Sequence, residues 1–139
     1  MKKGLIIYDS KTGTTHKFGE EIKKYLKDKG AEVELVSVSD YKNDEVGKAD
    51  FVLLGGWTSG LFIFLQHPDK PWIKMANDIS PLNGKKVGLF TTYKVATGSV
   101  FKKMKKNLGS KVDAVQFELK SKHGELKEEY KVQLDALLN

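Results

Sequence analysis

Three short segments of the chain combine glycine with hydroxyl side chains, a pattern that suits the binding of a phosphate or a flat polar ring. The first runs from Asp9 to His16 and reads Asp-Ser-Lys-Thr-Gly-Thr-Thr-His. The second covers residues 55–60 (Gly-Gly-Trp-Thr-Ser-Gly), and the third covers residues 91–99 (Thr-Thr-Tyr-Lys-Val-Ala-Thr-Gly-Ser). Backbone amides at the start of a helix attract anions, and hydroxyl groups add further donors. These segments therefore predict a site for a small phosphorylated molecule.

The first segment carries the most specific signal. It follows an apolar run and precedes an amphipathic pattern, so it joins a buried strand to the start of a helix. Ser10, Thr12, Thr14 and Thr15 supply hydroxyls, and Gly13 lets the backbone curl closely around an anion. Neither Gly-x-x-x-x-Gly-Lys-Ser/Thr nor Gly-x-Gly-x-x-Gly is present. A single monophosphate fits best, and a polar turn with a capping threonine is the alternative.

Apolar runs alternate with helical patterns along the whole chain. The runs are residues 5–8, 33–38, 51–54, 87–90 and 115–119. The first, third and fourth runs are nearly continuous, as in strands covered on both faces, whereas the second and fifth alternate as edge strands do. The predicted helices lie over residues 18–26, over 43–48, after Pro68, over 101–108 and over 126–138, with Gly30 and Gly109 as stops.

This alternation predicts an α/β fold with a five-stranded parallel sheet and helices on both faces, a three-layer sandwich. The favoured strand order is 2-1-3-4-5. The chain has 139 residues, a length that suits one domain over residues 1–139. Ligands of open α/β sheets bind beyond the carboxyl ends of the strands where the strand order reverses, here between strands 1 and 3. The three glycine- and hydroxyl-rich segments follow strands 1, 3 and 4.

The composition excludes several classes of function. The chain has no cysteine, which removes disulfides, thiolate nucleophiles and iron–sulfur ligation. It carries a net charge of +6 from lysine alone, and the absence of arginine argues against a nucleic-acid partner. No apolar run approaches the roughly 20 residues of a membrane helix, and the apolar N-terminal stretch is too short for a signal peptide, so we expect a cytoplasmic protein. No spacing of histidines predicts a metal site.

Residues 10–15, Ser-Lys-Thr-Gly-Thr-Thr, resemble the phosphate loop Thr/Ser-x-Thr-Gly-x-Thr of the flavodoxin family. The order of elements and the placement of this loop extend the resemblance over essentially the whole chain, and the lack of a long insertion in the fifth strand is similar to short-chain flavodoxins. The resemblance implies a flavodoxin-like fold, an FMN cofactor and a role as an electron carrier between redox partners. The residues implied to hold the phosphate are Ser10, Lys11, Thr12, Gly13, Thr14 and Thr15.

The resemblance also places the flavin ring between the second and third segments. Trp57 and Tyr93 are the expected stacking partners, because a flat apolar ring requires aromatic or apolar faces. Further cofactor contacts are expected from Thr58, Ser59, Gly60, Thr92, Thr97, Gly98 and Ser99. No catalytic residue is required, since the flavin carries the redox chemistry.

The sequence departs from the family in three respects. No glycine directly follows Trp57, where a peptide flip beside the flavin would use one, and Gly60 is the available substitute. Family members are usually acidic, but this chain is basic, and the lysine pairs 102–103 and 105–106 predict a partner with an acidic docking face. The apolar run Leu61–Gln66 before His67 suggests a lid over the flavin, a dimer contact, a buried turn or a pocket for a flat apolar ligand.

Two further functions stay open on the sequence. A flavin-dependent quinone or NAD(P)H reductase would share the fold, although the missing arginine weakens the case for NADPH. A module that binds haem or another tetrapyrrole is suggested by His67 beside the apolar run. A receiver-like regulator is excluded, because the third predicted strand ends in Gly55-Gly56-Trp57 and offers no aspartate.

Overall fold

A single twisted sheet organises the chain. The computed structural model describes residues 1–59 and 66–139. Within them, parallel strands run as β1 (Lys3–Tyr8), β2 (Glu32–Ser37), β3 (Phe51–Ser59), β5 (Lys86–Thr92) and β6 (Val115–Ser121). Their order, β2-β1-β3-β5-β6, confirms the predicted order 2-1-3-4-5 and the edge positions of the second and fifth predicted strands.

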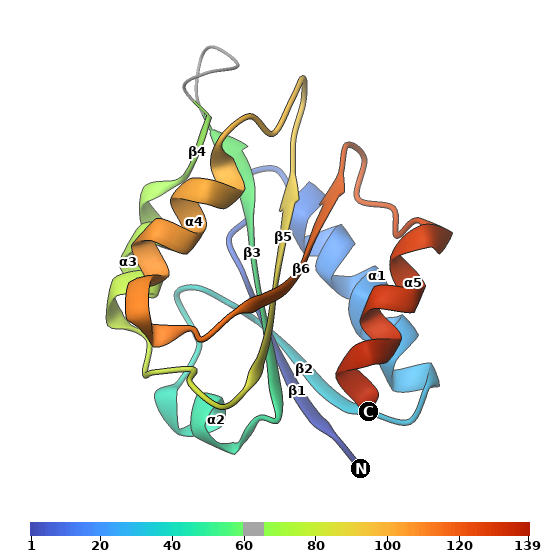
Figure 1. Ribbon diagram of the computed structural model, residues 1–139. Coiled ribbons are helices and arrows are strands. Elements are labelled where there is room, and N and C mark those ends of the chain that lie inside the picture. The colour runs from blue at the N-terminus through green and yellow to red at the C-terminus, as the bar shows by residue number, and fades with distance from the viewer. Residues whose placement is uncertain (60–65) are drawn as a thin grey trace.

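Helices cover both faces of the sheet and form the predicted three layers (Figure 1). The helices are α1 (Thr14–Asp28), α2 (Asn43–Lys48), α3 (Lys70–Asp78), α4 (Val100–Leu108) and α5 (Glu128–Asp135), with 3-10 turns at Gly109–Lys111 and Ala136–Leu138. α1 and α5 lie on one face, and α2, α3 and α4 lie on the other. Each face encloses its own cluster of buried apolar side chains, so the sheet separates two hydrophobic cores.

The amphipathic pattern of α1 explains how one helix is fixed against the sheet. Phe18, Ile22 and Leu26 recur every four residues and are fully buried. The ring of Phe18 meets the ring of Phe90 edge-on, with centroids 5.6 Å apart. Gly30, at a φ of 96°, ends the helix with the left-handed conformation that glycine adopts at little cost. The position of the α1 N-terminus beside the sheet follows from this packing.

β3 is longer than predicted, which corrects the second glycine-rich segment. The sequence predicts a strand ending at Leu54 and a loop over residues 55–60, but the strand continues to Ser59. A Cβ atom on Gly55 would lie 2.0 Å from the Phe90 ring, and one on Gly56 would lie 3.1 Å from the Trp72 ring. These glycines therefore make room for core rings within a strand and do not end it. The two-residue antiparallel strand β4 (His67–Pro68), which the sequence did not predict, pairs with the end of β3.

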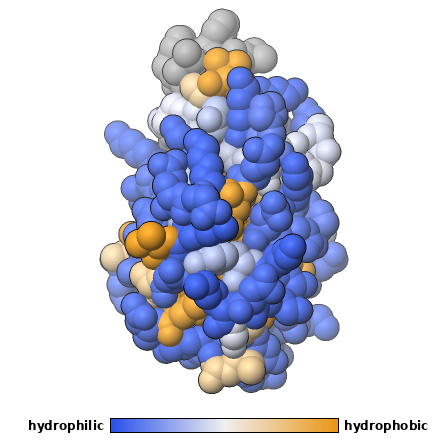
Figure 2. Space-filling view, turned by 90° about the vertical axis from the view of Figure 1, so that its right-hand side faces the viewer, coloured by the Kyte–Doolittle hydropathy of each residue, from blue (hydrophilic) through white to orange (hydrophobic). Residues whose placement is uncertain are grey.

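The outer surface over α1 and α5 is largely hydrophilic. Figure 2 shows hydrophobic colour there only in small, separate areas. This agrees with helices that bury one apolar stripe and leave the other face to water. In the described part of the chain, no helix has both the length and the apolar character that crossing a membrane requires.

Candidate functional site

The loop between β1 and α1 is shaped by the side chain of Ser10. Its hydroxyl accepts hydrogen bonds from the backbone N–H of Gly13 at 3.0 Å and of His16 at 3.4 Å. Gly13 precedes α1 with a φ of 94°, and no atom lies within 4 Å of where its Cβ would be. The first N–H groups of α1 lack partners within the helix, as at any helix start. The loop therefore presents amides beside open space.

The threonines of this loop have two different roles. The hydroxyls of Thr12 and Thr14 are 3.5 Å apart on the exposed side of the loop. The hydroxyl of Thr15 is buried and lies 2.6 Å from that of Thr92, which joins the first turn of α1 to the end of β5. No threonine caps α1, since Gly13 takes the N-cap position and the side chain that bonds the first amides is that of Ser10, so the alternative of a threonine cap is wrong. Thr12 and Thr14 remain available to an anion.

Both candidate stacking aromatics lie at the carboxyl end of the sheet, and each has a lysine nearby. Trp57 near the end of β3 and Tyr93 just after β5 are half-buried. The Lys11 ammonium lies 5.0 Å from the centroid of the Trp57 ring, and the Lys120 ammonium lies 5.9 Å from that of Tyr93. Both distances allow attraction between a cation and a π-face. The rim between the two aromatics is therefore positively charged.

The remaining residues predicted to contact a cofactor are spread over the same end of the sheet. Ser59 pairs with His67 in the β3–β4 ladder, and the hydroxyls of Thr58 and Thr91 lie 3.0 Å apart. The Ser99 hydroxyl donates a hydrogen bond to the backbone oxygen of Gln66 at 3.1 Å, which joins the start of α4 to the last residue of the apolar run. Thr97 and Gly98 precede this contact in the β5–α4 loop, where they are half-buried and exposed, respectively. Gly60 and residues 61–65 of the predicted apolar patch lie outside the described residues.

Asp9 is a buried acid for which the sequence predicts no role. Its side chain is 8% exposed, and its Oδ2 atom has no hydrogen-bond partner among the described residues. Burial and the nearby Asp69 raise the pKa of Asp9 from 3.8 to about 6, against a smaller opposing effect from a hydrogen bond with the Trp57 side chain. The available signal was an acidic residue directly after a buried strand and directly before the phosphate loop.

The histidines stand apart from one another. His16 lies 3.3 Å from Glu20 along α1, and a ring nitrogen of His67 lies 2.8 Å from the Pro68 carbonyl oxygen. His123 is exposed before α5. In residues 1–59 and 66–139, no three side chains of the types that bind metals are grouped closely enough to hold an ion.

Comparison with known proteins places these features in a family. The family model described as flavodoxin matches residues 6–136. The chain is 37% identical to the flavodoxin of Megasphaera elsdenii over 94 residues, which are 67% of this chain and 66% of that protein. It is 34% identical to the flavodoxin of Clostridium beijerinckii over 88 residues, which are 63% of this chain and 62% of that protein. These alignments thus span just under two thirds of either relative.

The fold comparison agrees over a longer span. The solution structure of two-electron-reduced Megasphaera elsdenii flavodoxin superposes with a TM-score of 0.76 at 26% identity. The superposition covers 96% of this chain and 97% of that one. Because the family match spans nearly all of the sequence, this chain belongs to the flavodoxin family, whose members typically bind FMN and carry electrons.

Proposed function

We propose that this chain binds one FMN and carries electrons between redox proteins. The observation that supports this most strongly is the loop over residues 10–15, which opens α1 at the carboxyl end of the central strand β1. The positive φ of Gly13 and the open space beside it leave room for a phosphate against the backbone. A loop of this kind favours a monoester dianion, because the amides and the helix dipole both attract negative charge.

The phosphate would be held by the first amides of α1 together with the hydroxyls of Thr12 and Thr14. Ser10 acts mainly by holding the loop, since its oxygen already accepts two backbone N–H groups. Thr15 and Thr92 act as a buried link between α1 and β5, because their hydroxyls are bonded to each other. The lysine at position 11 adds a positive charge to the same loop.

The flavin ring would lie at the rim formed by Trp57 and Tyr93. When bound, FMN supplies the reversible uptake of electrons that these side chains cannot supply. The half-buried rings of Trp57 and Tyr93 provide apolar faces that orient a flat ring and shield it from water. When the flavin stacks on these rings, the Lys11 and Lys120 ammonium groups would move off the faces of Trp57 and Tyr93 or stay at the outer edges of those two rings.

Comparison of FMN with riboflavin tests this proposal, because the two differ only in the phosphate. Charge-assisted hydrogen bonds are worth roughly 1.5–3 kcal/mol each. We therefore expect FMN to bind at least about 100-fold more tightly than riboflavin, as measured by fluorescence titration of the apoprotein. A visible flavin spectrum in the purified protein would support the same conclusion. Equal affinity for the two flavins would contradict it.

The lysines at the rim are expected to make the bound flavin easier to reduce than in acidic relatives. One unit charge about 10 Å away in water contributes about 0.4 kcal/mol, which is about 20 mV per electron. Lys11→Gln and Lys120→Gln should each lower the midpoint potential for the second electron by about 20 mV at low salt. Lys24→Gln, on the exposed side of α1, is the control and should leave it unchanged. Potentiometric titration of the loaded protein measures all three, and unaltered potentials would exclude this role for the lysines.

The proposed redox partner is a protein with an acidic docking face. α4 begins directly after the β5–α4 loop and exposes Lys102, Lys105 and Lys106, although Lys105 also lies 2.6 Å from Glu118. This helix therefore offers positive charge close to the proposed flavin rim. The rate of electron exchange with an acidic redox protein should fall as salt is added, because steering between opposite charges is screened. A rate that rises with salt would reject the acidic partner.

A further inference from the structure

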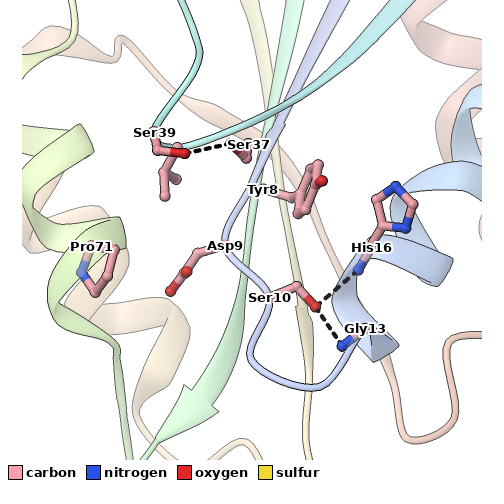
Figure 3. Close-up of a pocket in the computed structure, with 9 residues that line it drawn as sticks. Tyr8, Asp9, Ser10, Gly13, His16, Ser37, Ser39 and Pro71 are labelled. Atoms are coloured by element: carbon pink, nitrogen blue, oxygen red, sulfur yellow. Dashed lines mark hydrogen bonds between the residues drawn. The ribbon is translucent and has the colours of Figure 1, made fainter.

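A pocket lies beside the phosphate loop, next to the end of β2. Its volume is about 490 Å³, within the range of pockets that hold small molecules. Figure 3 shows Asp9 in its interior, with Pro71 on one side and Tyr8 on the other. Ser37 and Ser39 come from the end of β2 and the residues after it. The pocket thus joins one side of the phosphate loop to the end of β2 and the start of α3, two regions that the proposed flavin contacts do not use.

The side chain of Asp9 has a hydrogen bond from the Trp57 side chain, but one of its two carboxylate oxygens is left without a partner among the described residues. It is more than nine-tenths buried and lines the pocket, and its Oδ2 atom accepts no hydrogen bond from the described residues. Burial of an ionised carboxylate without compensation is costly. This carboxylate would therefore be stabilised by a ligand that brings hydrogen-bond donors.

No lysine of the described chain pairs with this carboxylate. The chain contains 24 lysines, and none of them forms an ion pair with Asp9 in the described structure. Residues 60–65 carry no ionisable side chain, so that segment cannot supply one. Asp69 acts electrostatically on Asp9, and Glu20 and Asp40 act on Tyr8 at the pocket wall. The pocket is therefore a locally acidic place in a basic protein.

The other lining groups suit an organic cation with a short apolar arm. The rings of Tyr8 and His16 have centroids 5.0 Å apart and form an aromatic wall, which attracts a cation through its π-face. Val38 and Pro71 add apolar contacts. The Ser37 and Ser39 hydroxyls, 2.8 Å apart, offer acceptors for additional N–H groups.

We propose that this pocket binds a small organic monocation, a primary ammonium or guanidinium group on a short apolar arm, through the Asp9 carboxylate. This inference does not depend on FMN binding, because the pocket groups that recognise the cation lie on the β2 flank of the loop. Ser10 and Gly13 line both places, so an occupied pocket would lie directly against the phosphate loop.

Benzylammonium is a suitable probe, with benzyl alcohol as its neutral counterpart of similar shape. Titration of the isotope-labelled full-length chain followed by backbone-amide NMR reports both affinity and location. We expect saturable shifts at residues 8–10 and 37–39 with benzylammonium, and at least about tenfold weaker binding of benzyl alcohol. Absence of saturation at tens of millimolar, or equal binding of the alcohol, would overturn the proposal.

Two variants separate recognition by Asp9 from general surface binding. Asp9→Asn keeps the shape of the side chain and should weaken benzylammonium binding at least about tenfold, whereas Asp28→Asn at the far end of α1 should not change it. Val38→Lys places an ammonium of the protein's own at the pocket and should also abolish binding while Asp9 is retained. Undiminished affinity in both pocket variants would disprove the assignment.

Discussion

Gly13→Ala is expected to weaken FMN binding by about 100-fold. The residue has a φ of 94°, which non-glycine residues adopt only with strain of roughly 1–2 kcal/mol. Relief of that strain would change the direction of the first amides of α1, which are proposed to hold the phosphate. It would also disturb the hydrogen bond from the Gly13 N–H to the Ser10 hydroxyl. Loss of about two charge-assisted contacts corresponds to the stated loss of affinity, which fluorescence titration with FMN measures.

Gly30→Ala provides a matched control at the other end of the same helix. Gly30 has a φ of 96°, and its Cβ position is equally free of neighbouring atoms. Both variants should therefore lose a similar free energy of unfolding, on the order of 1 kcal/mol. Only Gly13→Ala should lose FMN affinity. Equal affinities in the two variants would show that the loop conformation does not hold the phosphate.

The strand order and the loop between the first strand and the first helix could be predicted because they depend on local patterns. Continuous apolar runs in the central strands, alternating patterns at the edges and glycine stops all report local burial and backbone conformation. Gly30, predicted to stop the first helix, has the expected positive φ for this reason, and Gly13 also has one, although its contact with an anion stays a prediction. The family comparison and the sheet topology confirm the fold that these patterns indicate.

The end of β3 could not be predicted, because its conformation depends on residues distant in the sequence. Gly55 and Gly56 look like loop residues until Phe90 and Trp72 are seen to fill the space over them. The bond between Thr15 and Thr92 likewise joins residues that are 77 positions apart. The positions of Lys11 over Trp57 and of Lys120 over Tyr93 could not be predicted either, because each lysine is distant in the sequence from its aromatic neighbour. Sequence spacing identifies which residues could form a site, but not which of them bond to one another.

Asp9 was missed for a related reason. An aspartate between a strand and a polar loop has the appearance of an exposed turn residue. Its burial arises from the surrounding elements, with Asp69 before α3, Trp57 on β3 and the α1 residue His16 among its neighbours. Burial and the negative charge of Asp69 disfavour the charged form of Asp9, and together they outweigh the hydrogen bond from Trp57, which favours it. The balance is a raised pKa.

Asp9 should therefore destabilise the ligand-free fold at neutral and alkaline pH. Its pKa rises from 3.8 to about 6 on folding, so the folded chain binds this proton more tightly. The resulting stabilisation is complete below about pH 4 and is lost as the pH rises through about 6. The rise in pKa corresponds to a loss of at most about 3 kcal/mol in the free energy of unfolding at neutral and alkaline pH. The pKa values of Asp50 and Asp113 are lowered by folding, so these two groups change the stability at lower pH. Their effect is the same in two proteins that differ only at position 9, and it cancels when the two are compared.

Asp9→Asn is expected to raise the free energy of unfolding by as much as about 3 kcal/mol at pH 7.5, and by little or nothing at pH 4. Urea unfolding of both proteins across this range measures the difference, in buffers without amines so that the proposed pocket ligand is absent. Asp28→Asn, an exposed change of the same chemistry, should show no comparable dependence on pH. A constant difference between Asp9→Asn and the unaltered chain from pH 4 to 7.5 would mean that Asp9 is compensated by a group bound within the fold. If Asp9→Asn raises the free energy of unfolding only at neutral pH, the Asp9 carboxylate is an uncompensated charge in the ligand-free fold. Recognition of an organic cation by this pocket depends on that property.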